Sequence, residues 1–288
     1  MYKNRLKKAC FGLVMCIGAI GAACAQQLVN FNSLDGTALK ALVFHPPATS
    51  TSRTTRGTVI ALHGCDGLYA RFDAQRGPLN ARHQAMADLL VAEGYTAVFP
   101  DSLSPRGAVE LCTQKSGERT IDQNHRRADV LATLAWVALQ PWAKPERIAL
   151  LGWSHGGSAL LAATDASRAD VRSQTVKPAL AVAFYPGCAA SLKSGYQASA
   201  PLVLMLGEKD DWTPPEPCIA LGNAVGAEIN VYADSHHGFD EPTGEVKLYT
   251  QVPNGTKPGQ GVHAGPNLEA REKSYARLRA LLAKAVGQ

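Results

Sequence analysis

Residues 152–157 read Gly-Trp-Ser-His-Gly-Gly, with the apolar run 147–151 before them and a helix-like stretch, 158–164, after them. A Gly-x-Ser-x-Gly pattern between a strand and a helix is typical of a tight turn that exposes a nucleophilic serine. The glycines are expected because this turn strains the backbone and brings neighbouring segments close together. The pattern therefore predicts Ser154 as a nucleophile, with a glycine-rich helix cap and a buried serine as the alternative.

Strands and helices alternate along the rest of the chain. Short apolar runs bounded by Gly, Pro or Thr predict strands, and apolar residues at helical spacing predict helices. The predicted strands are 39–44, 58–62, 95–99, 148–151, 179–185, 202–206 and 228–232, and the further predicted helices are 81–93, 119–139, 215–225 and 268–286. This alternation predicts the α/β class, in a single domain with a mainly parallel sheet and helices on both faces.

Two long polar segments, 101–118 and 240–266, follow predicted strand ends. Binding clefts of α/β folds lie at the carboxyl ends of strands. We therefore expect both segments to form the rims of a binding site, with plain surface loops as the alternative.

Residues 1–25 have the pattern of a secretory signal peptide. Basic residues precede the apolar stretch 9–23, and Ala23-Cys24-Ala25 fits a small-x-small cleavage site before Gln26. The stretch is shorter than the ~20 residues that span a bilayer, so no permanent membrane span is expected. We expect a mature domain of residues 26–288 in the periplasm or outside the cell. Lipidation at Cys24 is the alternative, although Gly21 stands where such signals usually carry leucine.

Charge and cysteine content narrow the classes of partner. Removing the signal takes away four basic residues and no acidic ones, which lowers the formal net charge from +5 to about +1 and leaves no support for nucleic-acid binding. An even number of cysteines remains, and in an oxidising compartment it predicts two disulfides in any of three connectivities. The four residues are too widely spread for a zinc site, so no metal is expected: Cys65, Cys112, Cys188 and Cys218.

A serine hydroxyl becomes a nucleophile when an imidazole takes its proton and a carboxylate orients that imidazole. In the expected fold, acid and histidine follow later strands in that order. Asp210 and Asp211 follow strand 202–206, and we favour Asp210 because Asp211 can cap the following helix. His236 and His237 follow strand 228–232. We favour His237, because the small Gly238 lets its ring approach the serine.

Other histidines and neighbouring groups complete the candidate site. His63, His155 and His263 remain alternatives to His237, and the His236-His237 doublet has no third metal ligand at a recognisable spacing. The backbone N–H groups of Cys65 and His155 are the expected oxyanion donors, since one follows strand 58–62 and the other follows the nucleophile. Trp153 and Trp212 are candidates for a substrate pocket, with packing in the core as the alternative.

The chain resembles the dienelactone hydrolase family of α/β-hydrolases, especially its exported bacterial members. The resemblance is carried by His63-Gly64-Cys65, Pro100-Asp101-Ser102, the Ser154 turn, Tyr185-Pro186-Gly187-Cys188, residues 207–214 and His237-Gly238-Phe239. It implies an α/β-hydrolase fold, supports Ser154, Asp210 and His237 as the triad, and implies that Cys65 pairs with Cys112 and Cys188 with Cys218.

Two departures from the family pattern limit what the resemblance implies. The enzyme that names the family has a cysteine nucleophile where this chain has Ser154, and an arginine where this chain has Glu241. We therefore expect a cofactor-free serine hydrolase for small carboxylic esters and not for an anionic dienelactone. A peptidase or acyltransferase with the same triad, or a non-catalytic binding protein of the same fold, is the alternative. The ester and the oligomeric state are left open.

Overall fold

A computed structural model describes residues 26–47, 55–70 and 78–287. The predicted signal peptide, 1–25, lies outside the described residues. The chain folds as a single domain around an eight-stranded sheet with the order β1-β2-β4-β3-β5-β6-β7-β8. The strands are β1 (Gln26–Asn32), β2 (Ala38–Phe44), β3 (Thr58–Leu62), β4 (Thr96–Asp101), β5 (Ile148–Trp153), β6 (Leu180–Phe184), β7 (Leu202–Gly207) and β8 (Glu228–Tyr232).

The sheet is mainly parallel, as predicted. All neighbours from β4 to β8 are parallel, whereas β1 and β2 form an antiparallel hairpin and β2 pairs antiparallel to β4. Every residue of β3, β5, β6 and β7 is buried. Strands covered on both faces need apolar side chains on both, which explains why these segments are continuous apolar runs in the sequence.

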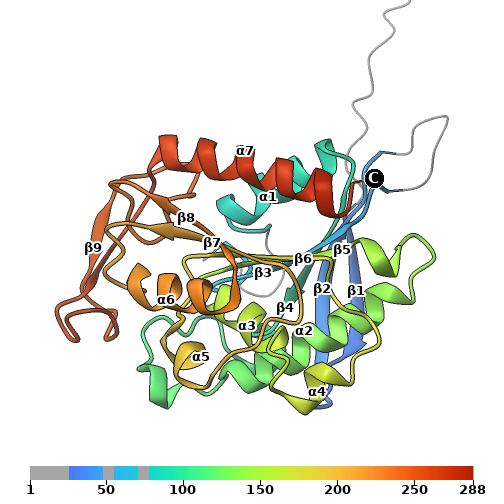
Figure 1. The fold of residues 1–288 in the computed structure, drawn as a ribbon, viewed down its shortest axis with the longest axis horizontal. Coiled ribbons are helices and arrows are strands. Elements are labelled where there is room, and N and C mark those ends of the chain that lie inside the picture. Colours follow the sequence, from blue (N-terminus) through green and yellow to red (C-terminus); the bar gives the residue numbers. More distant parts are fainter. Residues whose placement is uncertain (1–25, 48–54, 71–77, 288) are drawn as a thin grey trace, which may run out of the picture.

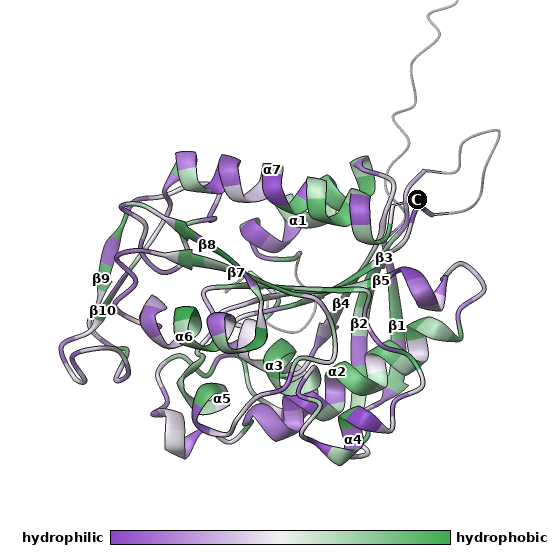
Figure 2. Cartoon of the chain, viewed as in Figure 1, coloured by the Kyte–Doolittle hydropathy of each residue, from purple (hydrophilic) through white to green (hydrophobic). Residues whose placement is uncertain are grey.

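Helices cover both faces of the sheet (Figure 1). Two of them, α1 and α7, lie on one face, and α2, α3 and α6 lie on the other. Each face has its own hydrophobic core, and Figure 2 shows the central strands as the most hydrophobic part of the fold. The helices are α1 (Ala81–Ala92), α2 (Gln123–Ala138), α3 (His155–Ala163), α4 (Ala169–Arg172), α5 (Ala189–Lys193), α6 (Pro215–Val225) and α7 (Leu268–Ala285), with short 3-10 turns at Ser104–Arg106, Ser116–Glu118 and Pro145–Arg147.

Several differences separate the structure from the sequence prediction, and the short helices α4 and α5 are among the elements that were not predicted. The edge strand β1 was not predicted, because it is largely exposed and contains no apolar run. Helix α2 begins at Gln123 and not near residue 119, because the Asp122 carboxylate accepts the N–H groups of Asn124 and His125 and fixes the helix start. The segment 240–266 contains the antiparallel pair β9 (Lys247–Tyr249) and β10 (Val262–Ala264).

None of the helices in the described part of the chain combines the length and the hydrophobicity needed to cross a bilayer.

Candidate active site

Ser154 lies at the turn from β5 into α3 with φ 52° and ψ −117°, an unusual conformation for a residue with a side chain. Its N–H donates to the Phe184 carbonyl at 2.9 Å. A Cβ at Gly152 would lie 2.6 Å from the Gly156 carbonyl oxygen, and one at Gly156 would lie 2.1 Å from the Leu62 carbonyl oxygen. Only glycine fits at either position, so the turn depends on both residues.

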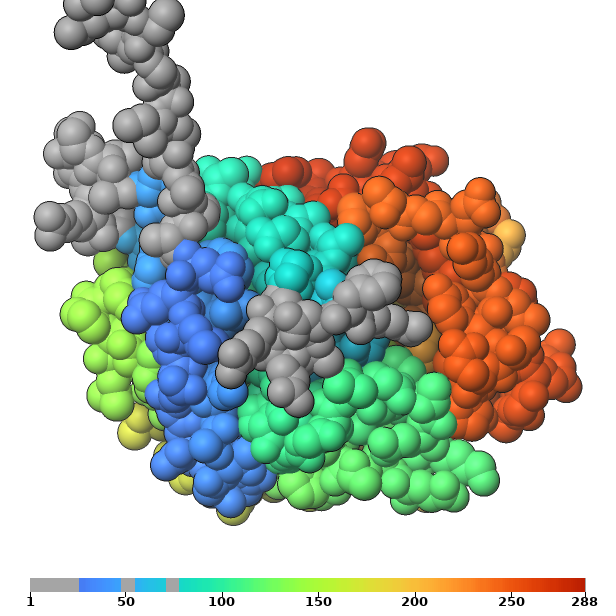
Figure 3. Space-filling view, turned by 180° about the vertical axis from the view of Figure 1, so that it is seen from behind, coloured from blue at the N-terminus to red at the C-terminus, as the bar shows by residue number. Residues whose placement is uncertain are grey.

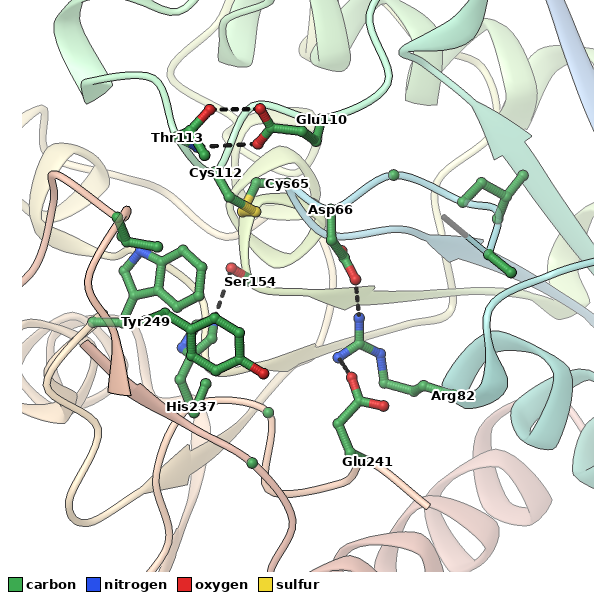
Figure 4. A pocket seen from close by; sticks show the side chains of 18 of the residues that line it. Cys65, Asp66, Arg82, Glu110, Cys112, Thr113, Ser154, His237, Glu241 and Tyr249 are labelled. Atoms are coloured by element: carbon green, nitrogen blue, oxygen red, sulfur yellow. Dashed lines mark hydrogen bonds and ion pairs between the residues drawn. A yellow bond between two sulfur atoms is a disulfide. The ribbon is translucent and has the colours of Figure 1, made fainter. Parts of the chain in front are cut away.

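The fold brings Ser154, His237 and Asp210 together. Ser154 Oγ lies 2.9 Å from His237 Nε2 (Figure 4). His237 Nδ1 lies 2.8 Å from Asp210 Oδ2. Asp210 follows β7 and His237 follows β8, so both come from the carboxyl edge of the sheet. All three residues are buried: Ser154 is 9% exposed, His237 is 4% exposed and Asp210 is 3% exposed. This arrangement can transfer a proton from the serine to the imidazole and orient the ring through the carboxylate.

Thr213 contacts the same group of atoms and was not identified from the sequence. Asp210 Oδ1 accepts the backbone N–H groups of Trp212 at 2.9 Å and Thr213 at 2.8 Å. The Thr213 hydroxyl lies 3.0 Å from Asp210 Oδ2 and 3.1 Å from His237 Nδ1. These contacts fix the carboxylate that faces the imidazole.

The alternatives to Asp210 and His237 lie elsewhere. Asp211 Oδ1 accepts the His263 N–H at 2.8 Å, and Asp211 Oδ2 lies 2.7 Å from His263 Nδ1. His236 completes this group: ligand atoms of Asp211, His236 and His263 lie within 4.8 Å of one another. The sequence spacing gave no sign of a third metal ligand because the fold brings His263 from the distant 240–266 segment.

His63 and His155 are buried and have structural partners. His63 Nδ1 lies 2.8 Å from the Gly64 carbonyl oxygen, and Ser102 N–H donates to His63 Nε2 at 3.2 Å. His155 Nδ1 accepts from Arg126 at 3.1 Å. Burial and the positive charge of Arg126 hold the pKa of both imidazoles well below the usual range. Both rings bond to groups other than Ser154, so neither takes the place of His237 beside the serine hydroxyl.

The segments expected to supply the oxyanion donors lie beside Ser154. A Cβ at Gly64 would be 3.7 Å from the Ser154 Cβ. Within the described residues, the backbone N–H groups of Cys65 and His155 donate to no other group. Unpaired N–H groups next to a nucleophile can stabilise a developing negative charge.

Arg126 links these two segments. Its Nη1 donates to the His63 carbonyl at 2.9 Å as well as to the His155 ring. Burial lowers the pKa of this guanidinium to about 10, while Asp129 opposes the shift. The sequence did not single out Arg126, because a lone arginine in a helix is ordinarily a surface residue.

Two disulfides join cysteines of the described residues, Cys65–Cys112 and Cys188–Cys218, with S–S distances of 2.02 Å and 2.00 Å. They are the pairs that the family resemblance implied. The first joins the loop after β3 to the segment 101–118, and the second joins the start of α5 to α6.

A pocket of about 670 Å³ opens above Ser154, and residues of both long segments, 101–118 and 240–266, line it as expected. Figure 3 shows these two segments, green and orange, on the same face of the molecule. Trp212 lines the pocket, and its ring centroid lies 4.6 Å from that of His237. Cys65 lies in the wall as well.

Trp153 does not line the pocket, which corrects the sequence expectation. It is fully buried, and its Nε1 donates to Asp240 Oδ2 at 2.7 Å. Trp153 ends β5, where successive side chains point to opposite faces of the sheet. Its ring enters the core below α1 and α7, whereas Ser154 reaches the pocket.

Arg82 carries the buried positive charge of the pocket, and carboxylates surround it (Figure 4). Its guanidinium lies 2.8 Å from Glu241 and 3.4 Å from Asp66. Burial raises the pKa of the Glu241 carboxyl, and Arg82 opposes that shift. Arg82 Nη1 donates to Glu241, and Nη2 donates to Asp66, so both terminal nitrogens of the guanidinium have carboxylate partners.

The fold is shared with several solved structures. A protein assigned as a dienelactone hydrolase, from Klebsiella pneumoniae, is 17% identical over 90% of this chain and 99% of its own, with a TM-score of 0.63. A dienelactone hydrolase-like promiscuous phosphotriesterase from metagenomic libraries is 16% identical over 92% of this chain and 100% of its own, with a TM-score of 0.63.

A third similar structure has a longer chain. It is a puromycin-hydrolysing peptidase from Mycobacterium tuberculosis, 14% identical over 92% of this chain and 40% of its own, with a TM-score of 0.56. No curated protein matches this chain significantly.

Residues 72–285 match the dienelactone hydrolase family, and this range contains the Ser154 turn, the loops after β7 and β8 and both segments around the pocket. The chain therefore belongs to the dienelactone hydrolase family and has the α/β-hydrolase fold of that family.

Proposed function

We propose that the protein is an exported serine hydrolase that cleaves carboxylic esters of small molecules. The proposal rests on one observation: Ser154, His237 and Asp210 form a continuous hydrogen-bonded chain at the base of a pocket. In the proposed mechanism, His237 Nε2 accepts the Ser154 proton while Oγ attacks the ester carbonyl. The N–H groups of Cys65 and His155 stabilise the resulting oxyanion.

The second half of the mechanism restores the enzyme. Collapse of the tetrahedral intermediate breaks the ester C–O bond, and His237 gives its proton to the leaving alcohol. A water molecule, deprotonated by His237, then attacks the acyl-serine and releases the carboxylic acid. Asp210 keeps the imidazole in the tautomer that each step needs. No step in this sequence draws on a cofactor.

Hydrolysis of neutral p-nitrophenyl esters by the wild type and by Ser154→Ala tests the proposal. We expect the substitution to lower kcat by at least about 10⁴-fold, because nothing else in the chain of hydrogen bonds supplies a nucleophile. Ser104→Ala is the matched control, since Ser104 lines the same pocket and should leave hydrolysis within a few fold of wild type. Equal activity in wild type and Ser154→Ala would contradict the proposal. Assays of the corresponding p-nitroanilides, run alongside the ester assays, distinguish an esterase from a peptidase.

We further propose that neutral esters are better substrates than esters carrying a carboxylate. Arg82 is neutralised by Glu241 and Asp66, and acidic residues outnumber basic ones in the lining, with Asp66, Asp101, Glu110, Glu241 and Glu245 against Arg82 and Lys247. An anionic acyl chain would meet net repulsion. We expect kcat/KM for p-nitrophenyl valerate to exceed that for the p-nitrophenyl monoester of glutaric acid by about tenfold, and Glu241→Gln to narrow the ratio. A preference for the anionic ester would contradict this specificity.

Export is supported by the two disulfides, because such bonds persist in oxidising compartments. We propose that cleavage before Gln26 releases residues 26–288 as the mature domain. Intact mass spectrometry of the protein recovered from the producing cell checks this. We expect a chain that begins at Gln26 and has no free thiol. A chain that begins at Met1 with four further reactive thiols at 65, 112, 188 and 218 would contradict it.

A further inference from the structure

Asp211, His236 and His263 form a second cluster of polar side chains beside the triad. They come from three places in the chain: the turn after β7, the loop after β8 and strand β10. Their ligand atoms lie within 4.8 Å of one another, and the two imidazole rings are 5.4 Å apart at an interplanar angle of 41°. None of the three lines the pocket that holds Ser154.

One buried polar atom of this cluster has no hydrogen-bond partner among the described residues. That atom is His236 Nδ1. A buried ring nitrogen without a partner is unfavourable, and it invites an explanation such as an ion. Asp211 and His263 face solvent, with side chains 30% and 46% exposed. An ion can therefore enter the cluster from outside without opening the fold.

We propose that Asp211, His236 and His263 bind a divalent transition-metal ion, with Zn²⁺ as the best match. Two imidazole nitrogens and one carboxylate oxygen are a ligand set that zinc uses, with water in the fourth position. Ca²⁺ and Mg²⁺ prefer all-oxygen sites, so this donor set disfavours them. In a tetrahedral zinc centre, ligand atoms lie about 3.3 Å apart, given bonds of about 2.0–2.2 Å. Binding would therefore require the Asp211 and His263 side chains, which are 30% and 46% exposed, to rotate so that the ligand atoms reach that spacing.

The position of the site gives the ion a role in holding the triad loops. Asp211 directly follows Asp210, and His236 directly precedes His237. His263 lies in β10, next to the point where Ala264 pairs with His237 and Gly265 N–H donates to the His237 carbonyl at 2.9 Å. One ion would join the acid turn, the histidine loop and the 240–266 segment that forms part of the pocket rim. This is a positioning role, since the ion lies outside the pocket.

Zinc titration of untagged protein, treated with EDTA and dialysed, tests the site by calorimetry and by thermal unfolding. We expect one Zn²⁺ per chain with a Kd in the micromolar range or below, and a rise in Tm because the ion binds the folded state. His263→Ala and Asp211→Asn should each weaken binding at least tenfold. Asp211→Asn is nearly isosteric, so a loss of binding there does not come from misfolding.

His125→Ala is the matched control. His125 Nδ1 lies 2.7 Å from Asp122 in an exposed pair that copies the His263–Asp211 contact, without a third ligand near it. The control should bind Zn²⁺ as the wild type does. Absence of binding to the wild type, or binding unchanged in both cluster variants, would overturn the proposal. So would binding that disappears in His237→Ala and persists in His263→Ala, because the ion would then lie on the triad. Binding is measured without substrate, so the result is independent of the proposed esterase activity.

Discussion

Neighbouring residues of the same type have different partners in this site. Asp210 is buried and faces His237, whereas Asp211 is partly exposed and faces His263. Likewise, His237 contacts Ser154 while His236 turns toward the Asp211 cluster. The direction of the backbone at each turn, and not residue type, decides which member of each pair can reach the serine.

Asp210→Asn and Asp211→Asn should therefore differ in activity, measured as ester hydrolysis in metal-free buffer. We expect Asp210→Asn to lower kcat by about 10⁴-fold, because an amide no longer holds the reacting histidine tautomer. Asp211→Asn should stay within a few fold of wild type, since its carboxylate touches neither Ser154 nor His237. Similar losses in both variants would undo the assignment of Asp210 as the orienting acid.

At this scale, the sequence located residues that follow strand ends and missed residues that support them through hydrogen bonds. Asp210 and His237 could be predicted because parallel strands deliver their next residues to one edge of the sheet. Thr213 and Arg126 could not, since a threonine in a turn and an arginine in a helix have no pattern that distinguishes them. Trp153 was misplaced as a pocket candidate, because the side of the sheet it faces depends on the register of β5.

At the scale of elements, the site depends on how closely α3 packs against β3. The Gly156 backbone touches the carbonyl oxygens of Leu62 and His63, where a Cβ would lie only 2.1 Å and 2.5 Å away. These two carbonyl groups lie at the carboxyl end of β3, the strand that leads into the Cys65 loop. The spacing between the nucleophile turn and the oxyanion loop is therefore set by a glycine in a helix.

Gly156→Ala should destabilise the fold by about 3 kcal/mol or more, because the added methyl group meets backbone that cannot move aside cheaply. Urea denaturation of purified protein gives the change in the free energy of unfolding. Gly117→Ala is the matched control, because a Cβ there meets no atom within 4 Å. If both variants unfold at the wild-type midpoint, the close contact between α3 and β3 is not as described.

The elements themselves were predicted unevenly. Strands β3 and β8 and helix α6 have the predicted bounds, because apolar runs and flanking Pro or Gly mark their ends. The edge strand β1 was missed because its stability comes from pairing with β2 in register, which local composition does not reveal. The β9–β10 pair was missed for the same reason, and also because its strands are short.

At the scale of the whole molecule, buried neutral histidines make folding sensitive to acid. Burial, with the charge of Arg82, lowers the pKa of His83 to about 3, and burial lowers the pKa of His63 and His155 well below the usual range. In the unfolded chain these rings titrate near pH 6.5. Below that pH the unfolded state binds more protons than the folded state, so stability falls as the pH decreases.

We expect the urea midpoint to decrease from pH 7 to pH 5, with each histidine contributing up to about 1.4 kcal/mol per pH unit. His83→Gln removes one of the three groups and should reduce the slope. A midpoint that stays constant or rises over this range would show that these imidazoles are protonated in the folded protein.

The central claim concerns covalent chemistry at Ser154, and the most direct measurement is labelling with a fluorophosphonate probe followed by peptide mass spectrometry. We expect one adduct per chain, on the peptide that contains Ser154, and no labelling of folded Ser154→Ala. An adduct on another residue, or no adduct on folded wild-type protein, would contradict the claim that Ser154 is an activated nucleophile.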